Sequence, residues 1–189
     1  IGDRSGIASS NGNLGNAYRS LREYQRAIEY YEKSLQISTE IGDQSGIAIN
    51  NSNLGNAYHS LGEYQRAIEY YEKGSLISTE IGDVLGIASN NGYLGNAYLS
   101  LGEYQKAIEY YEKALQISSE IGDRSGIASN NCNLGNAYRS LGEHQKAIIY
   151  YEKSLQISTE SGDRSGIASN IGNLGNAYFS LGEYQKAIE

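Results

Sequence analysis

The sequence contains no proline, no methionine and no tryptophan, and it has a single cysteine, Cys132. A lone cysteine cannot form an internal disulfide, which favours a reducing compartment, and we therefore expect a cytoplasmic protein. No stretch approaches the roughly 20 consecutive apolar residues of a membrane-spanning helix, so we expect no membrane partner. Because the sequence also lacks a secretory signal, a basic targeting stretch and an initial methionine, we expect a piece of a longer intracellular protein.

Residues that carry enzyme chemistry are scarce as well. The chain has two histidines, His59 and His144, and their spacing to Cys132 suggests neither a zinc site nor a nucleophile with its base. We therefore predict no enzyme activity, no catalytic residue, no metal and no cofactor. The net charge is −7, whereas a surface that follows phosphates needs many clustered Lys and Arg, so we also expect no nucleic-acid partner.

What the sequence does contain is one unit of 40 residues that recurs without an insertion. Leu14-Gly15-Asn16-Ala17-Tyr18, for example, returns at positions 54, 94, 134 and 174. Residues 1–40 and 121–160 differ only at positions 10, 12, 22, 24, 26 and 29 of the unit. We predict a single array over residues 1–189, composed of repeats 1–40, 41–80, 81–120, 121–160 and a shortened 161–189.

Each unit has the pattern of a helical hairpin. Asp3 is a suitable N-cap for the first helix, and its equivalent recurs in every copy. The second helix is expected to start near Glu23 and to end at Ile41-Gly42. Apolar residues at helical spacing form one stripe on each helix. These are Ile7, Leu14, Tyr18 and Leu21 on the first helix, and Tyr24, Ala27, Ile28, Tyr31 and Leu35 on the second.

Two local deviations from the unit predict weak points. The turn between the helices suits a glycine in the left-handed conformation, but the first copy has Arg22 there, which should reduce stability. The other copies have Gly62, Gly102, Gly142 and Gly182. In the second copy, Gly74-Ser75-Leu76 replaces Ser34-Leu35-Gln36, and we expect a weaker or slightly distorted helix at that point.

The residues of the unit resemble the tetratricopeptide repeat. The matching positions are Leu14, Gly15, Tyr18, Gly62, Ala27 and Tyr31. One hairpin cannot bury both of its faces, whereas stacked neighbours can. Together with the resemblance, this predicts an all-α fold, a right-handed α-α superhelix of about ten antiparallel helices. Two departures from the family pattern are an Asn at position 11 of the unit and a Thr or Ser in place of a proline at position 39.

The length of the unit and the segments Gly-Asp-Arg-Ser-Gly and Asn-Leu-Gly-Asn-Ala-Tyr are similar to the Pins/LGN family of spindle-orientation adaptors. That resemblance implies that the first helices line a concave groove, which binds extended, acid-containing segments of partner proteins. The segments 4–21, 44–61, 84–101, 124–141 and 164–181 contain no Asp or Glu. We therefore predict a protein–protein interaction scaffold with a neutral to basic groove that binds an acidic or mixed acidic and hydrophobic peptide segment.

Two positions of the first helix are candidates for peptide binding. Asn at positions 13 and 16 lies on nearly one face of the helix, and an amide can pair with both groups of a peptide backbone. These residues are Asn13, Asn53, Asn133 and Asn173, and Asn16, Asn56, Asn96, Asn136 and Asn176. Position 19 varies in almost every copy, which favours a role in specificity. Its residues are Arg19, His59, Leu99, Arg139 and Phe179.

Other interpretations of these patterns remain open. The Asn amides could bond between helices and fix the stacking, and the variation at position 19 could be tolerated drift at an exposed site. The array could also associate with itself end to end, since no polar capping helix is evident at either end. A third interpretation is the recognition arm of a larger signalling or effector protein. The identity of the partner does not follow from the sequence under any of these interpretations.

Overall fold

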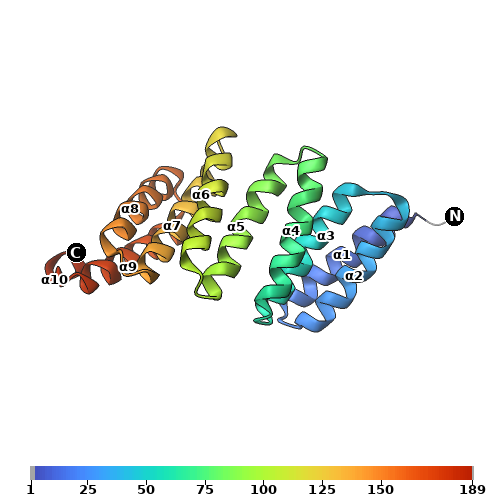
Figure 1. Ribbon diagram of the computed structural model, residues 1–189, viewed down its shortest axis with the longest axis horizontal. Coiled ribbons are helices and arrows are strands. Elements are labelled where there is room, and N and C mark those ends of the chain that lie inside the picture. Colours follow the sequence, from blue (N-terminus) through green and yellow to red (C-terminus); the bar gives the residue numbers. More distant parts are fainter. Residues whose placement is uncertain (1–2, 189) are drawn as a thin grey trace. The chain divides into compact units, whose positions relative to one another are not determined.

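The computed structural model describes residues 3–188, which form ten helices and no strand (Figure 1). The helices are α1 (Arg4–Ser20), α2 (Tyr24–Ile41), α3 (Gln44–Ser60), α4 (Tyr64–Glu80), α5 (Val84–Ser100), α6 (Tyr104–Glu120), α7 (Arg124–Ser140), α8 (His144–Ser161), α9 (Arg164–Ser180) and α10 (Tyr184–Ile188). The predicted all-α fold, with two helices for each 40-residue unit, is confirmed. None of the helices in this range is long and apolar enough to cross a membrane.

The helices fall into two compact units, Ile1–Ala97 and Tyr98–Glu189. In the first unit, α1 pairs with α2 and α3 pairs with α4, and α2 also packs against α3. In the second unit, α7 pairs with α8, and α9 packs against both α8 and α10. Each unit therefore repeats the same contacts, within a hairpin and between a second helix and the following first helix. The single array over residues 1–189 remains a prediction.

The first helices begin at the aspartates predicted to cap them. The side-chain Oδ1 of Asp3 accepts from the backbone N–H of Gly6 at 2.9 Å, and Asp43 does the same with Gly46 at 3.0 Å. The capped residue must be glycine, because a Cβ on Gly46 would lie 2.6 Å from the hydroxyl of Ser38. The second helices begin after Glu23 and its equivalents, whose side chains do not cap the backbone.

The turns inside the hairpins adopt the left-handed conformation that the sequence predicts. Gly62 has a φ of 79° and Gly142 has the same value. Arg22 is also left-handed, with a φ of 62°, although its side chain makes this conformation unfavourable. Gly42, with a φ of 72°, ends the second helix of the first copy where expected.

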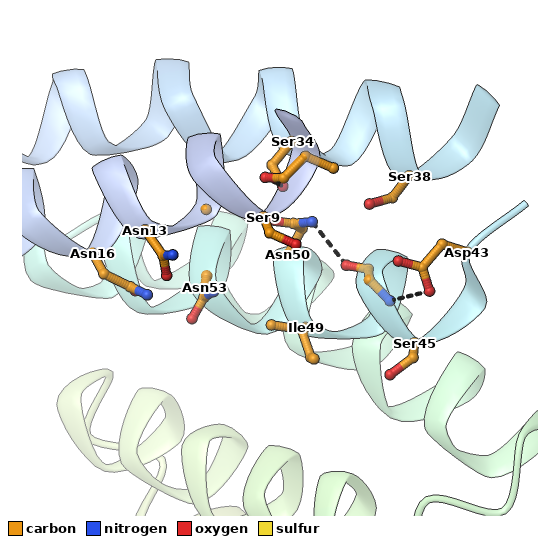
Figure 2. A pocket seen from close by; sticks show the side chains of 13 residues that line it. Ser9, Asn13, Asn16, Ser34, Ser38, Asp43, Ser45, Ile49, Asn50 and Asn53 are labelled. Atoms are coloured by element: carbon orange, nitrogen blue, oxygen red, sulfur yellow. Dashed lines mark hydrogen bonds between the residues drawn. The ribbon is translucent and has the colours of Figure 1, made fainter. Parts of the chain in front are cut away.

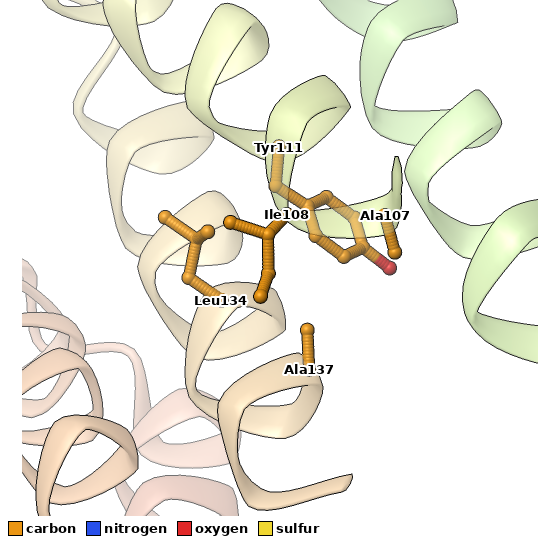
Figure 3. Packing of buried hydrophobic residues seen from close by; sticks show 5 residues of the cluster. All are labelled: Ala107, Ile108, Tyr111, Leu134 and Ala137. Carbon is orange, nitrogen blue, oxygen red and sulfur yellow. The ribbon is translucent and has the colours of Figure 1, made fainter. Parts of the chain in front are cut away.

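The core of each of the first four hairpins contains a buried tyrosine from the second helix, which is Tyr31, Tyr71, Tyr111 or Tyr151. A Cβ on Gly55 would lie 2.5 Å from Cε1 of Tyr71, so the first helix needs glycine where this ring packs. Between α6 and α7, Leu134 packs on Ile108 and Tyr111 of the preceding second helix (Figure 3). The core thus lies where a second helix meets the first helices on both of its sides.

The predicted apolar stripe of the first helix is only partly correct for α1. Leu54 and Leu134 are fully buried, whereas Leu14 is 44% exposed and Ile7 is 50% exposed. The reason is that the leucine at this position packs on the second helix of the preceding copy, as Leu134 does on α6. Since α1 is the first of the described helices, Leu14 has no such neighbour in this structure.

The expected distortion at Gly74 is wrong. Helix α4 runs without interruption from Tyr64 to Glu80, the same length as α6. Gly74 occupies the buried position of Ser34 at unchanged helical spacing, so the register of the hairpin is kept. The substitution instead places Leu76 at the surface, where it is 61% exposed.

Candidate functional site

Hollows lined by small polar side chains lie between successive first helices. The first of them, the α1–α3 hollow, has a volume of about 280 Å³ and is also lined by α2. Figure 2 shows Asn13, Asn16 and Asn53 at one end of this hollow and Asp43 and Ser45 at the other. The remaining lining residues are Ala8, Ser9, Gly12, Ser34, Ser38, Gly46, Ile49 and Asn50.

The same hollow recurs at the 40-residue spacing of the repeat. The α3–α5 hollow has a volume of about 210 Å³ and the α7–α9 hollow of about 310 Å³. Both are lined at equivalent positions by Ser, Asn and one Asp, which is Asp83 or Asp163. We call the surface that carries these hollows in each unit its first-helix face.

The first-helix face was predicted to be neutral to basic, but an aspartate lines each hollow. The sequence predicts them in the turns, and the structure shows that Asp43, Asp83 and Asp163 also line the edge of a hollow. One carboxylate oxygen of Asp43 and of Asp83 is used in the helix cap. The first-helix face is therefore not free of acid at this end of each hollow.

At position 16 of the unit, the amide oxygen of the Asn side chain accepts a hydrogen bond within its own hairpin. The hydroxyl of Tyr31 donates to Oδ1 of Asn16 at 2.8 Å, and Tyr151 donates to Asn136 at the same distance. Tyr71 does the same with Asn56, at 2.9 Å. These bonds join the second helix to the first helix of the same copy. They orient the amide and leave its NH₂ group, the donor half, for another partner.

The tyrosines of these bonds remain protonated donors at neutral pH. Burial raises the pKa of Tyr151 to about 12 and raises the pKa of Tyr31 as well. In Tyr31 the rise is opposed by a hydrogen bond with Arg19, which places the predicted specificity residue next to the Asn16 and Tyr31 pair.

The structure places the remaining Asn residues of the prediction on or near the hollows. Asn13 and Asn53 line the α1–α3 hollow, and Asn133 lines the α7–α9 hollow. The amide of Asn173 donates to Sγ of Cys132 at 3.7 Å. Asn176 lies apart from them, in an apolar hollow between α9 and α10.

The residues at position 19 have different surroundings. The ring of His59 lies 5.2 Å from that of Tyr64, and burial lowers the pKa of this histidine. Leu99 is partly buried against the hydrophobic cluster of α6 and α7. Phe179 is 65% exposed and lines the apolar hollow beside α10. A common role of these residues in specificity therefore stays a prediction.

Sequence reasoning missed the residues that form the floor of the hollows. Asn50, Asn90 and Asn170, at position 10 of the unit, are at most 4% exposed. Their amides donate to the backbone carbonyl four residues earlier, as Asn50 does to Gly46 at 2.8 Å (Figure 2). A signal was present in the sequence, because position 10 precedes position 13 by one helical turn and is Asn in most copies.

Cys132 lies in the α7–α9 hollow and is partly buried. Burial raises the pKa of its thiol, and hydrogen bonds with Asn173 and Ser169 oppose this rise. A protonated thiol is a poor nucleophile. Within residues 3–188, no group of His, Cys, Asp and Glu could hold a metal ion.

Comparisons with known proteins agree with this architecture. The structure is similar to that of BtubC (BKLC) from P. vanneervenii, with a TM-score of 0.86 and 24% identity, over 98% of this chain and 77% of that one. A protein described as a putative kinesin light chain from Podosopora anserina, with nearly identical repeats, has a TM-score of 0.81 and 21% identity, over 100% of this chain and 92% of that one. The comparison with curated protein sequences found no match.

A third similar structure is that of a Rap protein complexed with competence and sporulation factor. The TM-score is 0.82 and the sequence identity is 17%. The match covers 94% of this chain and 50% of the Rap protein. The family model described as tetratricopeptide repeat matches residues 6–75, 86–160 and 126–189, nearly the whole sequence. Together with the helical hairpins and their repeated contacts, this match shows that the chain belongs to the tetratricopeptide repeat family.

Proposed function

We propose that this chain is a protein–protein interaction scaffold that binds an extended peptide segment along its first-helix face. The observation that carries the proposal is the recurrence of one polar hollow at the spacing of the repeat, in the α1–α3, α3–α5 and α7–α9 positions. Asn16, Asn56 and Asn136 each have their amide oxygen fixed by a tyrosine hydroxyl. Their NH₂ groups are therefore oriented donors for the backbone carbonyls of a bound segment.

Within this proposal, the partner is acidic or of mixed acidic and hydrophobic character. Arg19 and Arg139 supply positive charge at position 19, where a carboxylate of the segment would pair with them. The Asp at the edge of each hollow limits how much acid the segment can carry, which favours the mixed character. The similarity to Pins/LGN adaptors has no support among the comparisons.

Two further aspects belong to the same proposal. The scaffold acts by holding its partner, without a chemical step of its own. Its single cysteine favours the cytoplasm, where thiols stay reduced. The similar Rap protein is complexed with competence and sporulation factor, which supports a ligand-binding role for this fold but does not identify a ligand for this chain.

The test separates the donor role of the amide from its role in the hairpin. A peptide selected from a random display library on the chain is titrated by calorimetry against wild type and the Asn16→Asp, Asn56→Asp and Asn136→Asp variants. Aspartate keeps an acceptor for the tyrosine hydroxyl and removes the NH₂ donor. We expect each variant to weaken binding by a factor of about 3 to 10, the effect of one net hydrogen bond.

The matched control is Tyr151→Phe, which removes the hydroxyl that orients Asn136 and leaves the amide in place. It should reduce the stability of the hairpin and affect binding less than Asn136→Asp does. Equal affinity of wild type and all three Asp variants would show that the amides only support the hairpin.

A second candidate function is end-to-end self-association of the array, which remains a prediction. Sedimentation over a hundredfold range of concentration decides between a monomer and an assembly. The role of recognition arm in a larger protein remains a prediction.

A further inference from the structure

The α3–α5 hollow differs from the other hollows in its apolar residues. Ile49 replaces the Ser of position 9, Leu85 the Ser of position 5, and Tyr93 the Asn of position 13. Ile49 and Tyr93 line the α3–α5 hollow, and Ile49 also borders the α1–α3 hollow. Leu85 lies next in sequence to Gly86, which lines the α3–α5 hollow. Tyr93 is therefore the residue that distinguishes this hollow from the others.

These apolar side chains are not part of the core. Ile49 is 56% exposed and Leu85 is 60% exposed. An exposed aliphatic residue at a single position needs no explanation, but several around one hollow are typical of a surface that binds an apolar group. The rest of the first-helix face in the first unit is polar at the same positions, as Ser9, Ser45 and Asn53 show.

The wall of this hollow is held in place by an aromatic contact. The ring of Tyr93 lies 5.3 Å from the ring of Tyr71 and is tilted by 33°. Tyr71 is only 2% exposed, and its hydroxyl is bound to Asn56. A ring supported in this way loses little freedom when a ligand packs on it, which favours binding.

The floor of this hollow has its hydrogen bonds satisfied from within. The hydroxyl of Ser52 lies 2.9 Å from Oδ1 of Asn90 and 3.1 Å from the carbonyl oxygen of Ala48, and it shares its one proton between these two acceptors. The amide of Asn90 donates to the carbonyl of Gly86 at 2.9 Å. In the α7–α9 hollow, Cys132 takes the place of Ser52 and Oδ1 of Asn170 is buried without a partner. An apolar group can therefore enter the α3–α5 hollow without depriving Asn90 of a partner.

We propose that Ile49 and Tyr93 make the otherwise polar α3–α5 hollow a subsite that receives one aliphatic or aromatic side chain of the bound segment. One repeat towards α1, the segment meets Arg19 and the polar α1–α3 hollow. The partner of the first unit thus carries an apolar residue with a polar or acidic neighbour on the α1 side. This subsite rests on the proposed function for its ligand.

The probe is a seven-residue acetylated host peptide of Asp, Glu and Ser with one central guest residue. Guest Leu and Asn are compared because their side chains have nearly the same size and differ in polarity. We expect the Leu peptide to bind wild type about tenfold more tightly, as burial of part of a leucine side chain implies. The variant Ile49→Ser, Leu85→Ser, Tyr93→Asn should abolish this preference. Each new residue is native at the same position of another copy, and circular dichroism confirms the fold.

A transplant supplies a gain of function. Ser129→Ile, Cys132→Ser and Asn173→Tyr place the residues of the α3–α5 hollow at the equivalent positions of the α7–α9 hollow. We expect the knockout that carries this transplant to regain a preference for the Leu peptide. The single variant Ile49→Ser should prefer the Leu peptide over the Asn peptide less strongly than wild type does.

A second arm uses N-acetyl-leucinamide and N-acetyl-asparaginamide, which need no groove, at millimolar concentration in ligand-observed NMR. Peptides that bind equally well with Leu and Asn would overturn the subsite and leave the groove proposal standing. Binding of the leucinamide to wild type and not to the knockout, without binding of any host peptide, would support the subsite and count against the groove. If neither probe distinguishes wild type from the knockout, the subsite is refuted.

Discussion

Replacing Cys132 by serine should stabilise the protein, because it completes a hydrogen bond that another copy already has. Asn170 is 1% exposed, and its amide donates to Gly166 at 2.8 Å and to Ser154 at 2.9 Å. These bonds fix the orientation of the amide, and its Oδ1 is left as a buried acceptor without a partner. In the equivalent place of the first unit, Ser52 donates to Asn90 at 2.9 Å.

The size of the effect follows from the cost of an unmet buried acceptor. Supplying its donor should contribute about 1 to 2 kcal/mol, and the lost thiol contacts with Asn173 reduce this to a net gain of about 1 kcal/mol. For a chain of this length, such a gain raises the Tm by about 2 to 4 °C. Thermal unfolding, followed by circular dichroism, measures the change in Tm. Urea titration measures the change in the free energy of unfolding, provided that the array unfolds in one step.

Two control variants isolate the hydrogen bond. Cys132→Ala removes the thiol without supplying a donor, so it should not be more stable than wild type. Ser52→Cys makes the reverse change in the first unit and should lower the stability by a similar amount. If Cys132→Ser is no more stable than Cys132→Ala, or if its gain persists in an Asn170→Ala background, the reasoning is wrong.

Three further predictions concern the scaffold itself. Arg22→Gly should stabilise the first hairpin by about 1 kcal/mol in urea titration, because it relieves a left-handed φ of 62°, and Arg22→Ala should not. Gly55→Ala should destabilise by about 1 to 3 kcal/mol, since its Cβ would lie 2.5 Å from the buried ring of Tyr71; an effect below that of a surface Gly→Ala change would contradict this packing. Burial raises the pKa of Tyr151 from 10.0 to about 12, so its stabilising contribution is complete below pH 10 and is lost as the pH rises to 12. Alkaline titration of wild type and Tyr151→Phe, followed by circular dichroism, should show a shallower loss of stability in the variant.

The hairpins were predictable because their signals are local. Asp3 caps α1 and Gly62 ends the first helix of the second copy, and both act within a few residues of the backbone they control. The error at Gly74 shows the limit of this reasoning. Glycine is a poor helix former and predicts a weak point there, but the packed neighbours hold α4 straight, and helical stability in proteins derives mostly from such packing.

The candidate site was predictable only in part. The periodicity identified Asn13 and Asn16 as residues of one face, and the structure places both in the α1–α3 hollow. The bond from Tyr31 to Asn16 joins residues 15 apart, and no spacing rule within one helix reveals it. The same holds for Ser52 and Asn90, which come from different copies.

The sequence by itself determined the all-α hairpin repeat, since its 40-residue period and capping residues act through local backbone geometry. It also determined which positions vary between copies. Only the tertiary structure decided which of these positions share a hollow, because a hollow combines two first helices with the second helix beside them. It likewise showed that Ile49 and Tyr93, from different copies, line one hollow. Contacts between copies depend on how the hairpins stack, as the packing of Leu134 on Ile108 and Tyr111 of the preceding copy shows.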